Sequence, residues 1–296
     1  MIILENSKIK IDIDNCTKCK ECVKDCVANL FSLDQGFLRL KDSFEEVCIE
    51  CGHCEAVCPV NVIQLKFHED GELEQSSIGE EFPTYSSFLK LVLNRRSIRR
   101  FKEKPIPKDI MEKLLKIGKY SPTGSNSENV SYTVVQDKKI VKAISKHITN
   151  KITKLVKTLE DPQGLKLLKI KLSGEEIKLA LENLPSSKRK LEMIKQGIDF
   201  WCWNGELIVI HGDKTIGGIP PNTALAAANI MLAAETLGLG ACSLGYLTYF
   251  INESQTIREL IKIPPNHAVG YSLAMGYPSV KYKRIPARKP LKVQWL

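Results

Sequence analysis

Two runs of closely spaced cysteines constrain the first sixty residues of this chain more than any other feature. Both runs follow the spacing C-x2-C-x2-C-x3-C, and the second lies 32 positions after the first. Three thiolates on one tight loop can reach three corners of an iron–sulfur cube, but the fourth ligand must come from a distant segment. The runs consist of Cys16, Cys19, Cys22 and Cys26, and of Cys48, Cys51, Cys54 and Cys58.

This spacing resembles that of a bacterial-type ferredoxin, in which the fourth cysteine of each run binds the other cluster. The resemblance implies a ferredoxin domain with two [4Fe-4S] clusters within residues 1–68. One cluster is expected to bind Cys16, Cys19, Cys22 and Cys58. The other is expected to bind Cys48, Cys51, Cys54 and Cys26.

Two other chemistries use clustered cysteines. Structural zinc sites usually pair one C-x2-C with a second pair farther along, whereas here four cysteines fall within 11 residues, twice. A disulfide framework belongs to secreted proteins, and the first residues do not read as a secretory signal. The pattern therefore favours clusters in a soluble, cytoplasmic protein, in a reducing setting.

Charge and length divide the chain. Its 296 residues, 43% of them apolar, are enough for two domains. The net charge of +9 is uneven, with −3 in residues 1–68 and +12 in the rest. Residues 69–83 form an acidic linker. No basic stripe interleaved with aromatics indicates nucleic-acid binding, and the most apolar stretch is too short for a membrane span.

Apolar periodicity predicts alternating helices and strands after the linker. Helices are expected at 84–93, at 108–119, at 138–160, and from Asn222 or Thr223 to Gly238. Strands are expected at 132–135, 206–211, 268–275 and 292–295, with short ones at 11–13 and 37–40 in the cysteine-rich part. Residues 165–200 are helical in pattern, without a clear register.

A second constellation is rich in arginine. Arg95, Arg96, Ser97 and Arg99 lie within five residues, and Arg288 lies far downstream. Guanidinium groups match phosphate oxygens bidentately, so such a group suits a phosphate. A solvated basic helix end is the other interpretation of this run alone.

Together with three further places, the arginine run resembles the nitroreductase superfamily over residues 84–296. Those places are S-P-T-G-S-N at 121–126, A-E-T-L-G-L-G-A-C at 234–242, and M-G-Y-P at 275–278. The resemblance implies an α+β fold, namely a nitroreductase-type α/β sandwich after the small ferredoxin-like domain. It also implies an intertwined homodimer that binds FMN.

The resemblance assigns roles position by position. Phosphate and ribityl contacts fall to Arg95, Arg96, Ser97, Arg99 and Arg288. The flavin ring is expected to contact Ser125 and Asn126, and the backbone at Leu244 and Gly245 is expected to face flavin N5. The chain departs from many relatives at Glu128-Asn129, and it has few aromatics between 140 and 190.

The combination predicts an iron–sulfur flavoprotein oxidoreductase without a protein general base, because the flavin carries the reaction. Clusters would pass single electrons from a donor such as a ferredoxin to FMN, which reduces a nitroaromatic, quinone or enone. NAD(P)H-linked flow outward through the clusters and a non-catalytic relay are the alternatives. Cys202 and Cys242 read as buried structural thiols.

Overall fold

The chain forms two compact units, as seen in a computed structural model that describes residues 3–66 and 82–296. One unit contains residues 1–82 together with 124–127, and the other contains 83–123 and 128–296. Apart from its last two residues, the acidic linker expected at 69–83 lies outside the described residues.

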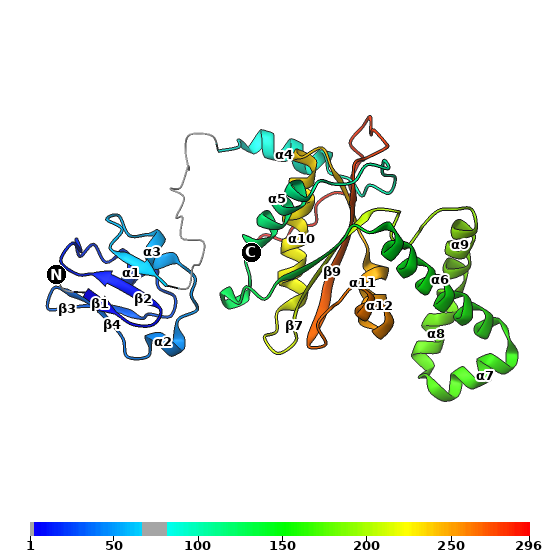
Figure 1. The fold of residues 1–296 in the computed structure, drawn as a ribbon, viewed down its shortest axis with the longest axis horizontal. Helices are drawn as coiled ribbons and strands as arrows, with labels where there is room; N and C mark the ends of the chain where they lie inside the picture. Colours follow the sequence, from blue (N-terminus) through cyan, green and yellow to red (C-terminus); the bar gives the residue numbers. More distant parts are fainter. Residues whose placement is uncertain (1–2, 67–81) are drawn as a thin grey trace. The chain divides into compact units, whose positions relative to one another are not determined.

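The first unit is built from short strands around a small apolar core (Figure 1). One antiparallel sheet has the order β1-β2-β5, and β3 pairs with β4 in a hairpin. The strands are β1 (Ile3–Glu5), β2 (Ile9–Asp12), β3 (Phe31–Asp34), β4 (Phe37–Leu40) and β5 (Ile63–Leu65). The helices are α1 (Glu21–Asp25), α2 (Phe44–Val47) and α3 (His53–Ala56). Ile9 and Ile11 are fully buried, and the rings of Phe31 and Phe44 meet edge to face at 5.7 Å.

The sequence repeat is also a backbone repeat. Asn29 and Asn61, 32 positions apart, both adopt a φ of 51°. Lys18 and Glu50, which show the same offset, have φ values of 60° and 55°. Left-handed backbone is uncommon outside glycine, and asparagine tolerates it best. The two cysteine loops therefore share a backbone path as well as a spacing.

The second unit is organised on an antiparallel sheet with the order β6-β7-β9-β8. Its strands are β6 (Ser131–Val135), β7 (Glu206–Asp213), β8 (Gly240–Ser243) and β9 (His267–Gly276). Along β7, Leu207 and Val209 enter one apolar cluster, and Ile208 and Ile210 enter the other. Successive side chains of a strand point to opposite faces, so both faces of this sheet are covered.

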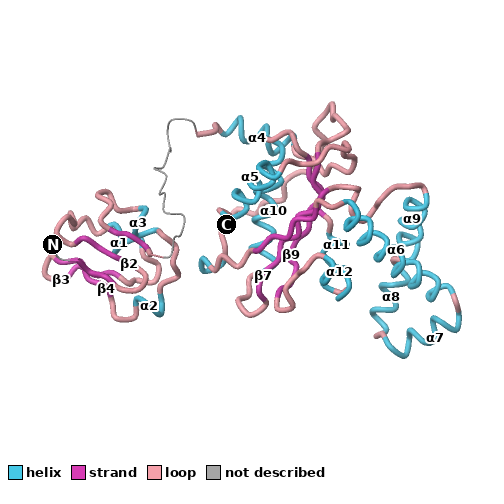
Figure 2. The backbone as a smooth tube through the Cα atoms, viewed as in Figure 1, coloured by secondary structure: helices cyan, strands magenta, loops and turns pink. Residues whose placement is uncertain are grey.

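Helices supply that cover (Figures 1 and 2). One cluster includes side chains of α5 (Lys108–Lys119) and α10 (Ile219–Thr236). The other includes side chains of α6 (Lys138–Glu160), α11 (Gly245–Asn252) and α12 (Gln255–Leu260). The α/β sandwich predicted for this part of the chain is confirmed.

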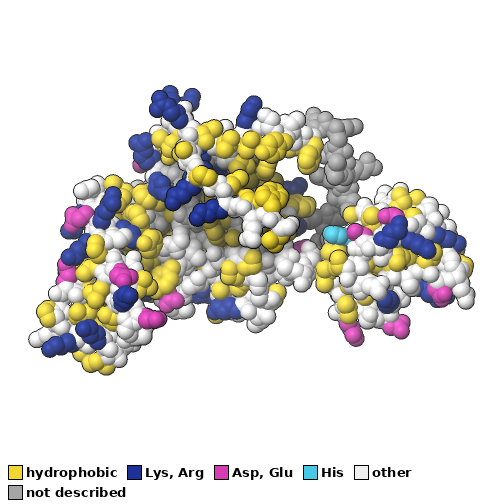
Figure 3. All heavy atoms as spheres, turned by 180° about the vertical axis from the view of Figure 1, so that it is seen from behind, with side chains coloured by type: hydrophobic (Ala, Val, Ile, Leu, Met, Phe, Trp, Pro, Cys, Tyr) yellow, Lys and Arg dark blue, Asp and Glu magenta, His cyan; other side chains and the backbone are white. Residues whose placement is uncertain are grey.

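Most of residues 165–200, whose register the sequence left open, lie in three helices next to α6. They are α7 (Pro162–Lys171), α8 (Gly174–Glu182) and α9 (Leu184–Lys195). Asp161 caps α7, and a capping box between Ser173 and Glu176 starts α8. No helix in residues 3–66 or 82–296 is long and apolar enough to cross a membrane. In Figure 3, Lys and Arg side chains of the second unit gather in several separate groups.

One predicted helix boundary and one predicted strand are wrong. Helix α10 begins at Ile219, not after Asn222 or Thr223, and two prolines occupy its first turn. Proline is tolerated there because the first N–H groups of a helix have no partner within the helix. The strand expected at 292–295 is absent, and Trp295 is 90% exposed. Helix α4 (Tyr85–Asn94) forms as predicted and buries none of its residues in this chain.

Candidate functional site

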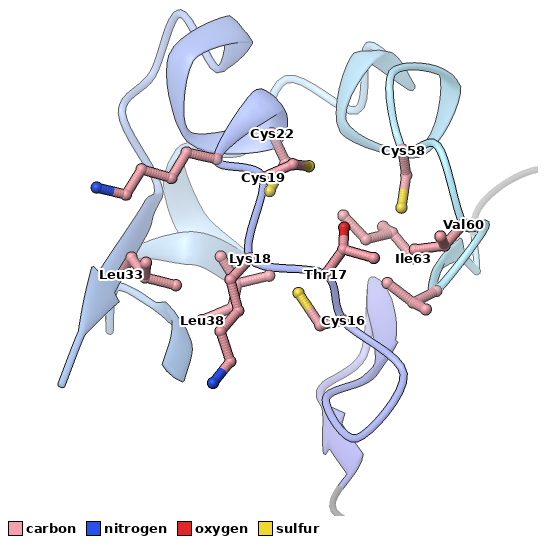
Figure 4. Close-up of a pocket in the computed structure, with 12 residues that line it drawn as sticks. Cys16, Thr17, Lys18, Cys19, Cys22, Leu33, Leu38, Cys58, Val60 and Ile63 are labelled. Carbon is pink, nitrogen blue, oxygen red and sulfur yellow. The ribbon is translucent and has the colours of Figure 1, made fainter. Parts of the chain in front are cut away.

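A pocket in the first unit is surrounded by four cysteines from both runs (Figure 4). Apolar side chains, Leu33 and Leu38 among them, complete its wall. Two of its cysteines lie on the loop that leads into α1, the third lies in α1, and the fourth comes from the second run. The four are Cys16, Cys19, Cys22 and Cys58.

A second pocket repeats this arrangement with the runs exchanged. Phe31, Phe44 and Leu65 contribute to its lining. Three of its cysteines come from the second run and one from the first. They are Cys48, Cys51, Cys54 and Cys26.

Strand pairing brings the runs together. Ile11 of β2 is the register partner of Ile63 of β5, and the Asp12 N–H donates to the Val62 carbonyl at 2.9 Å. The chain just before Cys16 therefore lies beside the chain just after Cys58. Helices α1 and α3, which carry the later cysteines of each loop, also pack against each other.

The pockets hold their thiols in apolar surroundings. Burial raises the pKa of Cys22 to about 11 and that of Cys54 to about 12. Main-chain N–H groups point at two sulfurs, from Leu30 to Cys26 Sγ and from Glu50 to Cys48 Sγ, both at 3.4 Å. Such bonds favour a thiolate, and they tune the potential of an iron–sulfur group.

All ten cysteines lie within the described residues and are free, so none of them forms a disulfide there.

The arginine run lies against the edge strand β8. Arg95 is the C-cap residue of helix α4. Ser97 forms an isolated β-bridge with Ala241, and the Ile98 N–H donates to the Ala241 carbonyl. Leu244 and Gly245 follow β8 directly, and Gly245 opens α11. Two segments that are more than 140 residues apart, both singled out in the sequence, therefore share one edge of the sheet.

Glu235 of α10 lies within the A-E-T-L-G-L-G-A-C motif but was not assigned a role from the sequence. Its carboxylate accepts a hydrogen bond from the backbone N–H of Arg96 and faces the charges of Arg95 and Arg96. Burial nevertheless raises the pKa of Glu235. Within the described chain, Nε of Arg96 is buried and has no hydrogen-bond partner. A buried donor of this kind is costly unless something binds to it.

Trp203 was also missed. It adopts a φ of 54°, its N–H donates to the Asp199 carbonyl at 2.8 Å, and its ring lies 5.7 Å from the guanidinium of Arg99. Arg99 also interacts with the Cys242 thiol, whose pKa burial raises. A cation over an aromatic face is held in place. Both Cys202 and Cys242 are buried, as predicted.

The M-G-Y-P segment also reaches the arginine run. The Lys102 N–H donates to the Tyr277 carbonyl at 2.8 Å, and the Ser279 N–H donates to the Arg100 carbonyl at 2.9 Å. Arg288, by contrast, is exposed in the segment after β9. In the described part of the chain, no hydrogen bond or ion pair joins Arg288 to the arginine run.

Ser125 and Asn126 lie in a short 3-10 turn, Gly124–Asn126, that belongs to the first unit. Both have positive φ values, 51° and 50°. Asn126 Nδ2 donates to the carbonyl oxygens of Ile49 at 3.2 Å and Glu50 at 3.1 Å. Local strain of this sort is retained where the surroundings fix it, and it clusters at functional sites.

Comparison with known proteins agrees with this architecture. Residues 92–277 match the model of the nitroreductase family, and residues 15–63 match that of a 4Fe-4S dicluster domain. A candidate NADH dehydrogenase/NAD(P)H nitroreductase of Archaeoglobus fulgidus is 26% identical over 191 residues, covering 64% of this chain and 84% of that protein. Ferredoxin-1 of Caulobacter vibrioides is 30% identical over 71 residues, covering 23% of this chain and 60% of that protein.

A solved structure shares the fold of the larger unit. It is a nitroreductase with bound FMN from Desulfitobacterium hafniense, 18% identical, with a TM-score of 0.51. The match covers 70% of this chain and 97% of that one. The family match spans well over half of the residues. The chain belongs to the nitroreductase family, and it joins that fold to a 4Fe-4S dicluster domain.

Proposed function

We propose that this protein is an iron–sulfur flavoenzyme that passes single electrons through two [4Fe-4S] clusters to FMN, for reduction of a small organic acceptor. One observation carries the proposal: each of two pockets is lined by three cysteines of one run and one of the other. That exchange is the ligand pattern of two-cluster ferredoxins. A reducing compartment, the cytoplasm, suits such clusters.

The cysteines would hold the clusters as thiolates. The first cluster would take Cys16, Cys19, Cys22 and Cys58, and the second Cys48, Cys51, Cys54 and Cys26. Burial disfavours the free thiolates of Cys22 and Cys54, so binding of iron must displace their protons. The clusters supply one-electron transfer when bound.

The residues beside β8, at the edge of the β6-β7-β9-β8 sheet, are suited to bind FMN. Arg95, Arg96, Ser97 and Arg99 present cations and a hydroxyl, and the buried Nε of Arg96 lacks a partner in the described chain. An anionic phosphate would satisfy such a donor. Apart from Gly245's immediate neighbours and its own helix backbone, a Cβ added there would meet no described atom within 4 Å, which is compatible with a flat ring beside it.

In this proposal the remaining assigned residues complete the flavin site. Arg288 would add a further phosphate contact, Ser125 and Asn126 would bond the ring, and Leu244 and Gly245 would direct backbone N–H groups at it. FMN supplies two-electron hydride chemistry when it is bound. In this proposal the protein positions the ring, and Glu235 positions the arginine run by accepting a hydrogen bond from the Arg96 N–H.

We include an intertwined homodimer in the proposal. Helix α4 exposes a row of apolar side chains, with Phe88 48% and Val92 40% exposed. The C-terminal segment exposes Leu291 (92%) and Trp295 (90%). A second copy of the chain would cover apolar surface that a monomer leaves in water.

The direction of electron flow distinguishes two versions. In the favoured one, a ferredoxin-like donor reduces the clusters, and a nitroaromatic, quinone or enone takes electrons from the flavin. In the alternative, NAD(P)H reduces the flavin and the clusters pass electrons outward, as the names of several relatives would suggest. A relay without its own substrate is the third version.

The test begins with anaerobically purified protein. Metal and flavin analysis is expected to find about eight irons and one FMN per chain. Flavin absorbance is then followed after mixing with a reduced ferredoxin or with NADH or NADPH, and after adding each acceptor class. Fast flavin reduction by ferredoxin and reoxidation by an acceptor would support the favoured version. Zinc in place of iron, or about four irons, would contradict the two-cluster assignment.

A further inference from the structure

Lys190 of α9 is a buried cation. Only 8% of its surface is exposed. Its Nζ donates to the hydroxyl oxygen of Tyr246 at 2.5 Å, and it lies 4.0 Å from the centre of that ring. Phe200 provides a second aromatic face, 5.6 Å from Nζ. Aromatic faces attract a cation, but they do not neutralise its charge.

Three acidic side chains of the neighbouring elements are engaged elsewhere. Glu160, at the end of α6, pairs with Lys188. Glu192 of α9 pairs with Lys195 at 2.6 Å. Asp199 accepts from Ser145 Oγ at 2.7 Å and from two backbone N–H groups. No carboxylate among the described residues forms an ion pair with Lys190.

A buried charge destabilises the folded state unless it is paired. An ammonium group can only donate, so the oxygen of Tyr246 must act as the acceptor in their bond. The hydroxyl proton of Tyr246 is then free to be donated to another group. Tyr246 is 48% exposed, so a molecule arriving from solvent can reach this donor.

The position of Tyr246 links this pair to the proposed flavin site. Tyr246 follows Gly245 in the first turn of α11, and Gly245 is where the flavin ring is placed. The partial positive charge of the α11 N-terminus adds to that of Lys190. We propose that Lys190 and Tyr246 form a subsite for an anionic group, such as a carboxylate, on the acceptor. This inference rests on the proposed flavin function.

The experiment compares two acceptors that differ in charge. 4-Nitrobenzoate and 4-nitrobenzyl alcohol share a ring and a nitro group, and only the first is an anion. With the reduced holoprotein, Lys190→Met is expected to raise the KM for 4-nitrobenzoate about tenfold or more, the size of one charge-assisted contact. The KM for the alcohol should stay within about twofold. Lys190→Arg should restore part of the preference for the anion.

Two further variants separate binding from packing. Tyr246→Phe keeps the ring under the cation but removes the hydroxyl, and it should weaken 4-nitrobenzoate selectively. Lys195 is an exposed residue of the same helix, so Lys195→Met should leave both KM values unchanged. Equal losses with both acceptors in Lys190→Met would mean that Lys190 only supports the fold, and unchanged KM values would also overturn the subsite.

Binding is measured independently of turnover. Calorimetric titration of the oxidised holoprotein with benzoate and with benzyl alcohol should show tighter binding of the anion, lost in Lys190→Met. If wild type turns over neither of these acceptors nor a quinone or an enone, the proposed function fails, while this titration still decides the subsite. Equal binding of the two probes by wild type would overturn it.

Discussion

The backbone N–H of Ile98 donates a hydrogen bond of 2.9 Å to the carbonyl oxygen of Ala241. This bond attaches the arginine run to β8, the edge strand of the sheet. Gly240, the residue before Ala241, lies under the Ile98 side chain, and a Cβ built there would be 2.4 Å from Ile98 Cγ1. The close approach of the two segments therefore depends on the absence of a side chain at position 240.

We expect Gly240→Ala to push Ile98 away and to lower the free energy of unfolding by about 1–3 kcal/mol. FMN affinity should fall with it, because the arginines move with Ile98. Chemical denaturation and flavin titration measure the two effects. Gly174→Ala is the control, since a Cβ at Gly174 meets nothing within 4 Å. A variant at 240 as stable as wild type would contradict the packing argument.

Arg95→Ala and Arg288→Ala are each expected to weaken FMN binding by about 1–3 kcal/mol, the scale of a charge-assisted contact. Flavin titration of the apoprotein gives the dissociation constant. The absorbance of the clusters should not change. Arg284→Ala, on the same exposed segment as Arg288, should bind FMN normally. Normal flavin content in both test variants would remove them from the site.

Cys22→Ser removes one proposed ligand of the first cluster. If electrons reach FMN through the clusters, reduction of the flavin by a ferredoxin-like donor should slow strongly. A small chemical reductant that reaches the flavin directly should still act at the wild-type rate. Single-turnover flavin reduction with each donor is the measurement. Equal loss with both donors would indicate misfolding, and equal activity with both would exclude the clusters from the path.

A histidine pair makes stability depend on pH. His211 lies within 3.1 Å of Thr133 Oγ1 and 2.7 Å of His267 Nδ1. Burial, then the charges of His267 and Arg258, lower the pKa of His211 to about 4. The unfolded state, with a pKa near 6.5, binds the proton first, so stability falls as pH drops from about 6.5 toward 4.

Between pH 7.5 and pH 5 this linkage amounts to about 2 kcal/mol of unfolding free energy. In His211→Asn that part of the pH dependence should disappear, although the variant is less stable at neutral pH. Urea unfolding of wild type and variant at both pH values, followed by tryptophan fluorescence, gives the difference. His53→Asn, at an exposed histidine, should keep the wild-type slope. Parallel slopes for His211→Asn and wild type would refute the linkage.

Truncation after Pro290 removes the exposed apolar side chains of the C-terminal segment. If a second copy covers them, the wild type should sediment as a dimer and the truncated chain should dissociate at micromolar concentration. Analytical ultracentrifugation distinguishes the two masses. Replacing Lys292 with Ala in the full-length chain should leave the dimer intact. A wild-type monomer would reject the homodimer.

The sequence predicted those elements whose pattern is local. Helices at 108–119 and 138–160 have the expected bounds, because their apolar residues recur with the helical period. Strand β8 was missed, since it has only four residues and Gly240 and Ala241 carry little side-chain signal. The strand expected at 292–295 finds no partner among residues 3–66 and 82–296, and a strand forms only when one is available.

The same distinction applies to the sites. The four cysteines that line each pocket are the sets that the resemblance to bacterial-type ferredoxins implied. Lys190, Trp203 and Glu235 leave no local signal. Their roles come from contacts with Tyr246, Arg99 and Arg96, which are 56, 104 and 139 positions away. Only the tertiary structure brings such residues together.

The exchange of Cys26 and Cys58 also bears on how the small unit matures. Neither cysteine run alone provides four thiols for one pocket, because the fourth cysteine of each run lines the pocket of the other run. Cutting or unfolding one half therefore opens both pockets. Under the proposed assignment, iron insertion cannot be finished in one half while the other is unformed. The duplicated halves are interlocked, so the two centres are gained and lost as a single unit.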